Sequence, residues 1–437
     1  MINNISKLFI LSISILSATL ITGPAIPDLI TTFSGIFFLF YLYYTNQYKK
    51  IFKEKIFIIS ILFWFYLLIV SIFAENKLLS FSDSLVFIRI LILPISIYFW
   101  VTLDRKDLNN ILLVIFLCVV FVIIDTLFQF TQYNSEFGFG RDLLGFKSNW
   151  YGRLTGPFGN ELIPGAYLSK FSFLGLSFLL IITKQNKFKN IICVFYLSIL
   201  GLTIFASGER MALATYGMGL FFLLIFFKNR SIFIISILVT ITLILVIKNF
   251  HPSYNDFNII ESTPYHLGLK VEKNFKCNND KLSKCTKIIN LQPSFTKVLK
   301  NFDKSPYGEI YKLSFEMFKN NVLVGVGLNN FTHLCKNDLK YKKIITNYVC
   351  ASHPHNFYIQ WLVEAGVIGF FIFIVYLSYL SYFILIKNYN EYSLFSFVTI
   401  LVLFWPIMST GSLLKNWNGI ITFFIIGISL ALTKIKK

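Results

Sequence analysis

The chain has 437 residues, of which 56% are hydrophobic, 18% aromatic and only 14% charged. This composition excludes an ordinary soluble globular protein and predicts a polytopic membrane protein. The formal net charge of +19 does not indicate a nucleic-acid partner, because no basic helix or aromatic-basic module accompanies it.

Twelve apolar runs come close to the roughly 20 residues that a helix needs to cross a bilayer. The first run is preceded only by Lys7 and shows no evident small-residue cleavage site, so we expect it to be retained and not removed as a signal peptide. The predicted fold class is therefore an all-α polytopic membrane protein with about twelve transmembrane helices. The predicted spans are 8–27, 29–44, 56–73, 84–102, 111–130, 165–183, 190–206, 211–227, 231–248, 364–386, 393–410 and 419–433.

The short loops predict the orientation of these helices. With a cytoplasmic N-terminus, lysine and arginine gather in the inside segments, whereas three short outside loops hold only Lys77, Arg210 and Lys415. Both termini are then cytoplasmic, and two longer segments, about 131–164 and about 249–363, lie outside. The expected organisation is 1–248 with nine helices and the loop at about 131–164, a large outer loop at 249–363, and 364–437 with three helices.

Cysteine usage agrees with this layout. Two cysteines fall within predicted spans, and an even number falls in the large outer loop, which favours disulfides on an oxidising side of the membrane. The simplest of the three connectivities is sequential, because short loops close most easily. A zinc site is the alternative, although no C-x-x-C spacing is present. The candidate pairs are Cys277 with Cys285 and Cys335 with Cys350.

The large outer loop contains one predicted amphipathic helix. From Tyr307 to Asn320, four apolar residues are spaced as on one helix face, namely Ile310, Leu313, Phe315 and Phe318. The segment 322–331 follows as a glycine-bearing turn. The helix either packs over the membrane bundle or takes part in substrate binding, and its pattern alone leaves both alternatives open.

Arginines are rare and gather on the outer side. Of six in the chain, Arg89 lies near the outer end of a span, Arg153 lies in a glycine-rich loop, and Arg210 lies at a tight corner between spans. A guanidinium grips phosphate oxygens bidentately, which lysine cannot do. We therefore predict a cationic cluster at the outer boundary, where a lipid diphosphate would lie. The alternatives are an ion pair of Arg89 with Asp125 and a plain turn-rich loop around Arg153.

Two histidines stand where the large outer loop re-enters the membrane. In the segment 352–361, His355 is the candidate for proton transfer or acceptor binding and His353 for a lining role, because histidine accepts protons near neutral pH. Ser352 is the expected cap of the following helix, with Pro354 in its first turn. Structural histidines are the alternative, and a metal pair is disfavoured because no further ligand set accompanies them.

Beyond the histidines, polar residues recur at every fourth position. Asn356, Gln360 and Glu364 share one face of a helix that is otherwise Phe, Tyr, Ile, Trp, Leu and Val. A polar stripe on such a helix predicts the lining of a cavity.

The order of these motifs resembles the O-antigen ligase and polymerase superfamily. The resemblance spans most of the chain and depends on order, spacing and placement between spans. The motifs are Asp125-x3-Gln129, Arg153-Leu154-Thr155-Gly156-Pro157-Phe158, Ser207-Gly208-Glu209-Arg210, Gly325-Val326-Gly327-Leu328-Asn329-Asn330-Phe331 and His355-Asn356-Phe357-Tyr358-Ile359-Gln360 before Glu364-Ala365-Gly366-Val367-Ile368-Gly369.

The resemblance implies a bacterial inner-membrane glycosyltransferase of the GT-C type. Such an enzyme is metal-independent, inverting and without a cofactor, and uses an undecaprenyl-diphosphate-linked glycan as donor at the periplasmic face. His355 matches the essential periplasmic histidine of the family, and Arg210 matches the arginine proposed to hold the donor diphosphate. Many members also carry an arginine just before the loop helix. This chain lacks it, and Lys304 or Lys312 are the candidate replacements.

Three enzymes fit these features equally and differ only in their acceptor. A ligase transfers the glycan to lipid A–core, a polymerase joins lipid-linked repeats, and a protein O-oligosaccharyltransferase glycosylates a protein. The expected function is the ligase. A lipid-glycan flippase or transporter is the non-enzyme alternative, but it predicts charges spread through the depth of the spans. Here the charges gather at one face.

Overall fold

The computed structural model describes residues 2–101, 105–134, 138–150, 152–255, 258–262, 269–273, 285–289, 300, 302–345, 350–407 and 409–435. These residues fold almost entirely into helices, as predicted. Eight of the described helices are long and apolar enough to cross a membrane, and four shorter apolar helices accompany them. The chain is an all-α polytopic membrane protein, and each predicted span corresponds to one of these helices.

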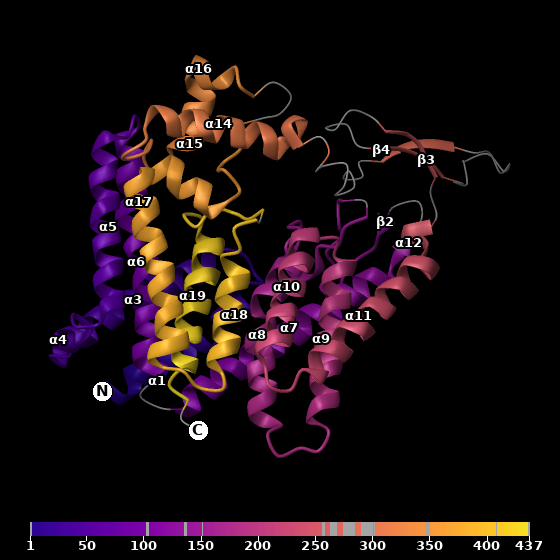
Figure 1. The fold of residues 1–437 in the computed structure, drawn as a ribbon, viewed down its shortest axis with the longest axis horizontal. Helices are drawn as coiled ribbons and strands as arrows, with labels where there is room; N and C mark the ends of the chain where they lie inside the picture. The colour runs from indigo at the N-terminus through magenta and orange to yellow at the C-terminus, as the bar shows by residue number, and fades with distance from the viewer. Residues whose placement is uncertain are drawn as a thin grey trace. The chain divides into compact units, whose positions relative to one another are not determined.

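Contacts divide the chain into two compact units, Met1–Ile115 with Pro306–Lys437 and Phe116–Ser305. In the first unit, α6 packs against α3, α5 and α19, and α17 packs against α5. Figure 1 shows α14 and α15 beside one end of α5, α6 and α17. The unit contains α1 (Ile2–Ser14), α2 (Leu16–Thr19), α3 (Ala25–Tyr44), α4 (Tyr48–Ile51), α5 (Lys55–Phe73), α6 (Lys77–Val101), α14 (Pro306–Asn320), α15 (Asn330–Asn337), α16 (Leu339–Lys342), α17 (Phe357–Tyr382), the π-helical turn η3 (Phe383–Lys387), α18 (Ser393–Leu403) and α19 (Asn416–Leu432).

The second unit is a bundle in which α8 packs against α9 and α10, and α9 packs against α11. The helix α7 (Arg105–Thr131) begins in the first unit and ends in this one. A small antiparallel sheet of order β3-β4-β5 follows the bundle, within the large loop where the sequence predicted only a helix. The elements are β1 (Tyr133–Asn134), β2 (Gly138–Phe139), η1 (Gly156–Phe158), α8 (Pro164–Ile182), α9 (Lys189–Ala206), α10 (Arg210–Phe226), α11 (Ser231–Phe250), α12 (Pro252–Asn255), β3 (Asn258–Ser262), β4 (Leu269–Lys273), β5 (Cys285–Ile289) and η2 (Phe302–Lys304).

Two predicted spans run too far, and prolines lie near both of their true ends. Three others begin six or seven residues earlier than predicted, at Lys77, Arg105 and Phe357. The first span was expected to run to residue 27, but α3 already begins at Ala25 after a turn at Gly23, whose φ is +113°. Pro27 and Asp28 lie in the first turn of α3, where a missing N–H costs nothing and a negative charge is favourable. The eleventh span was expected to reach residue 410. It ends at Leu403, shortly before Pro406.

The predicted amphipathic helix is α14, and it packs on α17. Ile310, Leu313 and Met317 are buried there with Phe331 of α15 in one apolar cluster. The predicted face was partly wrong, because Phe315 is 51% exposed and Met317 takes its place in the cluster.

The turn after α14 fills a break in α17. Gly366 has a φ of +67°, which interrupts the helix and leaves backbone groups without their usual partners. The segment 322–327 supplies those partners: Val326 N–H donates to Val363 O at 2.9 Å, and Gly327 N–H to Glu364 O at 3.0 Å. Val367 N–H in turn donates to Val322 O at 2.9 Å. A helix break inside a membrane protein requires this kind of internal satisfaction.

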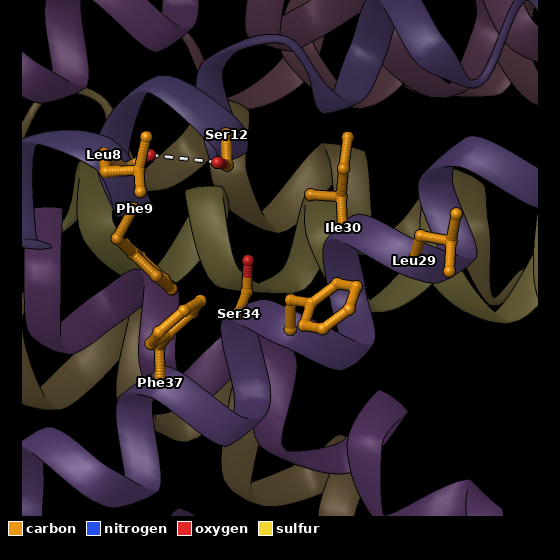
Figure 2. A pocket seen from close by; sticks show the side chains of 8 residues that line it. Leu8, Phe9, Ser12, Leu29, Ile30, Ser34 and Phe37 are labelled. Carbon is orange, nitrogen blue, oxygen red and sulfur yellow. Dashed lines mark hydrogen bonds between the residues drawn. The ribbon is translucent and has the colours of Figure 1, made fainter.

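An apolar pocket of about 190 Å³ lies between α1 and α3 (Figure 2). It is lined by Leu8, Phe9, Ser12, Leu29, Ile30, Phe33, Ser34 and Phe37. None of the predicted site residues lines it, and Ser12 uses its hydroxyl to donate to Leu8 O at 2.9 Å. The pocket offers no chemistry and belongs to the apolar surface of the bundle.

Candidate functional site

His355 has a left-handed backbone. Its φ is +58°, a conformation that costs a non-glycine residue free energy and that clusters at functional sites. Its carbonyl accepts a hydrogen bond from Thr410 N–H at 2.9 Å, which holds the residue in this conformation. Thr410 lies in the loop 404–415, the α18–α19 loop. The segment before α17 is therefore held in a strained conformation by a distant part of the sequence.

His353 is fixed by hydrogen bonds at both ring nitrogens. Nε2 lies 3.1 Å from Thr410 O, and because a carbonyl only accepts, this nitrogen carries the proton. Nδ1 then accepts from the Ser352 hydroxyl at 2.7 Å. Burial, together with the neighbouring His355, lowers the pKa of His353 to about 4. His353 is therefore neutral near pH 7 and has a fixed tautomer, which suits a residue that anchors the loop.

The imidazole of His355 lies between two other rings. Its centroid is 4.2 Å from that of His353 and 5.8 Å from that of Tyr307, which meets it edge-on. The Tyr307 hydroxyl is 2.7 Å from Ser409 Oγ in the α18–α19 loop. Burial lowers the pKa of His355, so the ring is neutral near pH 7. A neutral imidazole is able to accept a proton from a substrate hydroxyl.

The helix after the histidines is capped by Asn356. Its Oδ1 accepts from Tyr358 N–H at 2.9 Å and from Ile359 N–H at 3.2 Å, so the predicted cap by Ser352 is wrong. Asparagine at this position satisfies two of the free amides of the first turn, whereas Ser352 is bonded to His353. The Asn356 Nδ2 donates to Pro406 O at 2.7 Å.

The predicted polar face of α17 exists and is buried. Gln360 Nε2 lies 3.0 Å from Glu364 Oε2 and 2.6 Å from Ser412 Oγ. Gln360 and Glu364 are only 2% and 1% exposed. These groups therefore bind the α18–α19 loop to α17, next to the histidines.

The sequence interpretation missed the α18–α19 loop. This loop contacts Tyr307, both histidines, Asn356 and Gln360 through the hydrogen bonds described above. A signal was present, because Pro406 and the polar run Ser409-Thr410-Gly411-Ser412 interrupt a predicted span. Lys415, at the end of the loop, is also close enough to lower the pKa of His353.

A disulfide ties the histidine segment to α15. Cys335 and Cys350 are bonded, as predicted, and the Thr332 hydroxyl donates to Ala351 O at 3.0 Å. These links fix the chain three residues before His353. The other predicted pair lies outside the described side chains, because Cys277 and the side chain of Cys285 are not described.

In the second unit, Gln129 holds the segment that carries Arg153. Gln129 Oε1 accepts from Thr155 N–H at 3.0 Å and from Gly156 N–H at 2.9 Å. Gly156 has a φ of +50°, and a Cβ there would lie 2.5 Å from Thr126 Oγ1, so only glycine fits. Arg153 O accepts from Ser148 Oγ at 2.7 Å. The arginine segment is thus an ordered turn against α7.

Glu209 joins this segment to two helices. Its carboxylate accepts from Gly165 N–H at 2.6 Å and from Ala166 N–H at 3.0 Å, the free amides at the start of α8. Burial raises the pKa of Glu209 to about 7, while Arg153, those two amides and Lys170 act in the opposite direction. The sequence motif included Glu209 without a role, and it missed Lys170. The signal for Glu209 was its position directly before Arg210, a predicted site residue.

The predicted arginines have different surroundings. Arg210 is the exposed first residue of α10, next to Glu209, and the side chain of Arg153 lies within 3.4 Å of the Cβ position of Gly208. Glu209 thus lies near Arg153 and directly precedes Arg210 in the second unit.

Arg89 belongs to the first unit. It forms an ion pair with Asp28 and donates to Thr32 Oγ1 at 2.9 Å and to Asn416 Oδ1 at 3.1 Å. The ion pair that we considered as its alternative role exists, but Asp28 is the partner and not Asp125. Asp125 Oδ1 instead accepts from Leu143 N–H at 3.0 Å.

The replacements for the missing loop arginine are only partly described. Lys312 is exposed on α14, whereas the side chain of Lys304 is not described. In the parts of the chain that the structure describes, no three His, Cys, Asp or Glu side chains come together as metal ligands.

One comparison with known proteins finds a similarity to a described family. Residues 194–374 match a family model described as O-antigen ligase. The match begins within α9 and ends within α17, so it includes Arg210, α14 and both histidines. No curated protein matches the chain. The chain, a multi-pass membrane protein, is thus similar to the O-antigen ligase family over this part of its length.

Proposed function

We propose that the protein is an O-antigen ligase-like glycosyltransferase that moves a glycan from undecaprenyl diphosphate to lipid A–core. The site would face the periplasm, in the inner membrane of a bacterium, on a GT-C-type scaffold. The observation that carries this proposal is His355, a half-buried neutral imidazole in a strained, left-handed conformation within the family match. Strain of this kind is kept where a side chain must be aimed at a reacting group.

In the proposed reaction, His355 accepts the proton of an acceptor sugar hydroxyl. The oxygen attacks the anomeric carbon, and the bond from that carbon to the diphosphate oxygen breaks. Attack from the opposite face inverts the anomeric configuration, and undecaprenyl diphosphate leaves with the bonding electron pair. His353, Asn356 and Gln360 line the site and hold the loop that aims His355.

The second unit is proposed to hold the donor diphosphate. Arg210 and Arg153 would stabilise the negative charge that develops on the leaving group, without a metal ion or cofactor. Glu209 would position them. Arg89 would take part only if a diphosphate replaced Asp28 as its partner, which makes it the weakest of the three candidates.

The proposed function is tested with purified protein in lipid bilayers. The donor is an undecaprenyl-diphosphate-linked glycan, and three separate reactions offer lipid A–core, a second lipid-linked repeat, or an acceptor peptide. We expect glycan on lipid A–core. Product only on the second repeat identifies a polymerase, and product only on the peptide identifies a protein O-oligosaccharyltransferase. Movement of the lipid-linked glycan across the bilayer without transfer identifies a flippase.

Deletion of the gene gives the matching result in cells. Loss of a ligase leaves lipid A–core without long glycan while lipid-linked polymer accumulates. Loss of a polymerase leaves core with a single repeat.

A further inference from the structure

The loop 141–147, here the Leu143 loop, is a closed turn. Asp142 N–H donates to Phe146 O at 2.9 Å, and Phe146 N–H donates to Asp142 Oδ1 at 2.6 Å. Gly145 has a φ of +89°, which glycine adopts without strain. Arg141 and Lys147 pair as an isolated antiparallel bridge at its base. Aspartate at the start and glycine near the end are the residues that such a turn requires.

The tip of the Leu143 loop is apolar and exposed. Leu143, Leu144 and Phe146 are 49%, 54% and 47% exposed. Loops that face water usually carry polar side chains, and three adjacent large apolar side chains mark a surface that meets something apolar. Trp150, which follows the loop, is 47% exposed, and tryptophan is enriched at membrane interfaces.

The loop lies alongside α7 and not beyond its end. Leu143 N–H donates to Asp125 Oδ1 at 3.0 Å, and α7 continues to Thr131. At a rise of about 1.5 Å per residue, Asp125 is about 9 Å before the helix end. On this part of α7, Ile124 and Phe128 are 54% and 39% exposed, as expected of side chains that face lipid. The loop tip therefore lies at the level of a lipid-facing helix surface.

Buried carboxylates and a close backbone contact hold the Leu143 loop beside α7. Asp125 is fully buried and Asp142 is 4% exposed. Gly140 N–H donates to Gln132 O at 3.0 Å, and a Cβ on Gly140 would lie 2.7 Å from that same oxygen. The close approach requires glycine and holds the residue before the loop against Gln132, the residue that follows α7.

From these observations we infer that the tip of the Leu143 loop is immersed in the outer leaflet of the bilayer and contacts lipid hydrocarbon. The segment 131–164 then re-enters the membrane and does not lie wholly in the aqueous phase. The inference does not depend on the proposed glycosyl transfer, because it concerns the depth of a loop and requires no activity.

The test uses the full chain in lipid nanodiscs, with Cys118 and Cys193 replaced by alanine. Leu144→Cys is labelled with the fluorophore NBD, and Glu161→Cys, an exposed polar position of the same segment, is the matched control. We expect phosphatidylcholine carrying a nitroxide on its acyl chain to quench the label at 144 at least threefold more than the label at 161. Iodide in the water should show the reverse preference.

A second labelled variant, Phe146→Cys, controls for a local distortion caused by the substitution at 144. Its label should also be quenched more by the nitroxide lipid, and less by iodide, than the label at 161. Equal access of iodide to positions 144 and 161 would place the loop in water and overturn the inference. Protection of position 144 from both quenchers would show that protein covers the tip, either this chain or a second copy, and would overturn it as well.

Discussion

At the scale of single residues, His355 combines a proposed chemical role with a strained backbone, so the choice of substitution matters. We predict that His355→Asn lowers glycan transfer at least about a hundredfold, because general base catalysis contributes roughly that much. Asparagine tolerates the left-handed conformation, so the variant should keep the thermal stability of the native protein. Initial rates of transfer and thermal unfolding in detergent measure the two effects.

The companion variants separate chemistry from strain. His355→Ala should lose transfer equally and also some stability, whereas His353→Ala should retain partial transfer because its imidazole anchors the loop. Native-like transfer by His355→Asn would exclude His355 as the proton acceptor.

Arg210 is predicted to act through its planar guanidinium. Arg210→Lys keeps the charge but loses the bidentate geometry, and a charge-assisted hydrogen bond contributes about 1.5–3 kcal/mol. The transfer rate of Arg210→Lys should therefore fall about ten- to a hundredfold, and that of Arg210→Ala should fall further. The assay is transfer from purified lipid-linked glycan at several donor concentrations.

Arg230 is the matched control for Arg210. It precedes α11, and its guanidinium donates to Ile225 O at 3.2 Å. Arg230→Ala should transfer at the native rate. If Arg230→Ala fails while Arg210→Ala does not, the diphosphate site has been assigned to the wrong arginine.

At the scale of secondary-structure elements, the disulfide between α15 and the histidine segment has a measurable role. We predict that Cys335→Ser lowers stability by about 3 kcal/mol, since the bond closes a loop with a sequence separation of 15 residues. Transfer should fall as well, because Cys350 lies just before His353. Thiol counting on unfolded, unreduced protein should find two free thiols, Cys118 and Cys193. Six would contradict both predicted pairs.

The break in α17 depends on glycine. Gly366→Ala should lower the free energy of unfolding by more than about 1–3 kcal/mol, which is the cost of a left-handed backbone alone. The new Cβ would also lie only 2.3 Å from Leu323 O, so it would clash. Gly35→Ala in α3, where a Cβ meets nothing within 4 Å, should be neutral or slightly stabilising. The melting temperatures of both variants, measured in the same detergent, test this prediction. Equal melting temperatures would show that α17 does not need its break.

Elements were predictable where a pattern repeats along the chain. The spacing of Ile310 and Leu313 predicted α14, and apolar length predicted the spans. Two contacts of the α18–α19 loop were not predictable, because the loop makes them with backbone groups: Thr410 N–H donates to His355 O, and Pro406 O accepts from Asn356 Nδ2. Nearly every residue offers the same backbone groups, so the residue types in the loop do not indicate these two partners. The partner of Arg89 was missed because the predicted spans end at residue 27 and begin again at residue 29, which places Asp28 in a loop. In the structure Asp28 belongs to the first turn of α3, where it pairs with Arg89.

At the scale of the whole molecule, the distribution of positive charge predicts the topology. We predict that green fluorescent protein fused after residue 437 fluoresces, because the charge distribution predicts a cytoplasmic C-terminus. Alkaline phosphatase should be active when fused after Ser305 in the large outer segment. The matched control, the same enzyme fused after Lys187 in a cytoplasmic loop, should be inactive. The reverse pattern of activity would invert the assigned orientation.

The α18–α19 loop also sets an order of events during biosynthesis. The ribosome makes the histidine segment before it makes Pro406, Thr410 and Ser412, which hold that segment in place. A nascent chain that has inserted α17 but not yet α19 therefore carries both histidines without their hydrogen bonds to Thr410. The last helices to leave the ribosome complete the site, so a chain that stops after α17 is left with an unformed histidine site however well its earlier helices have inserted.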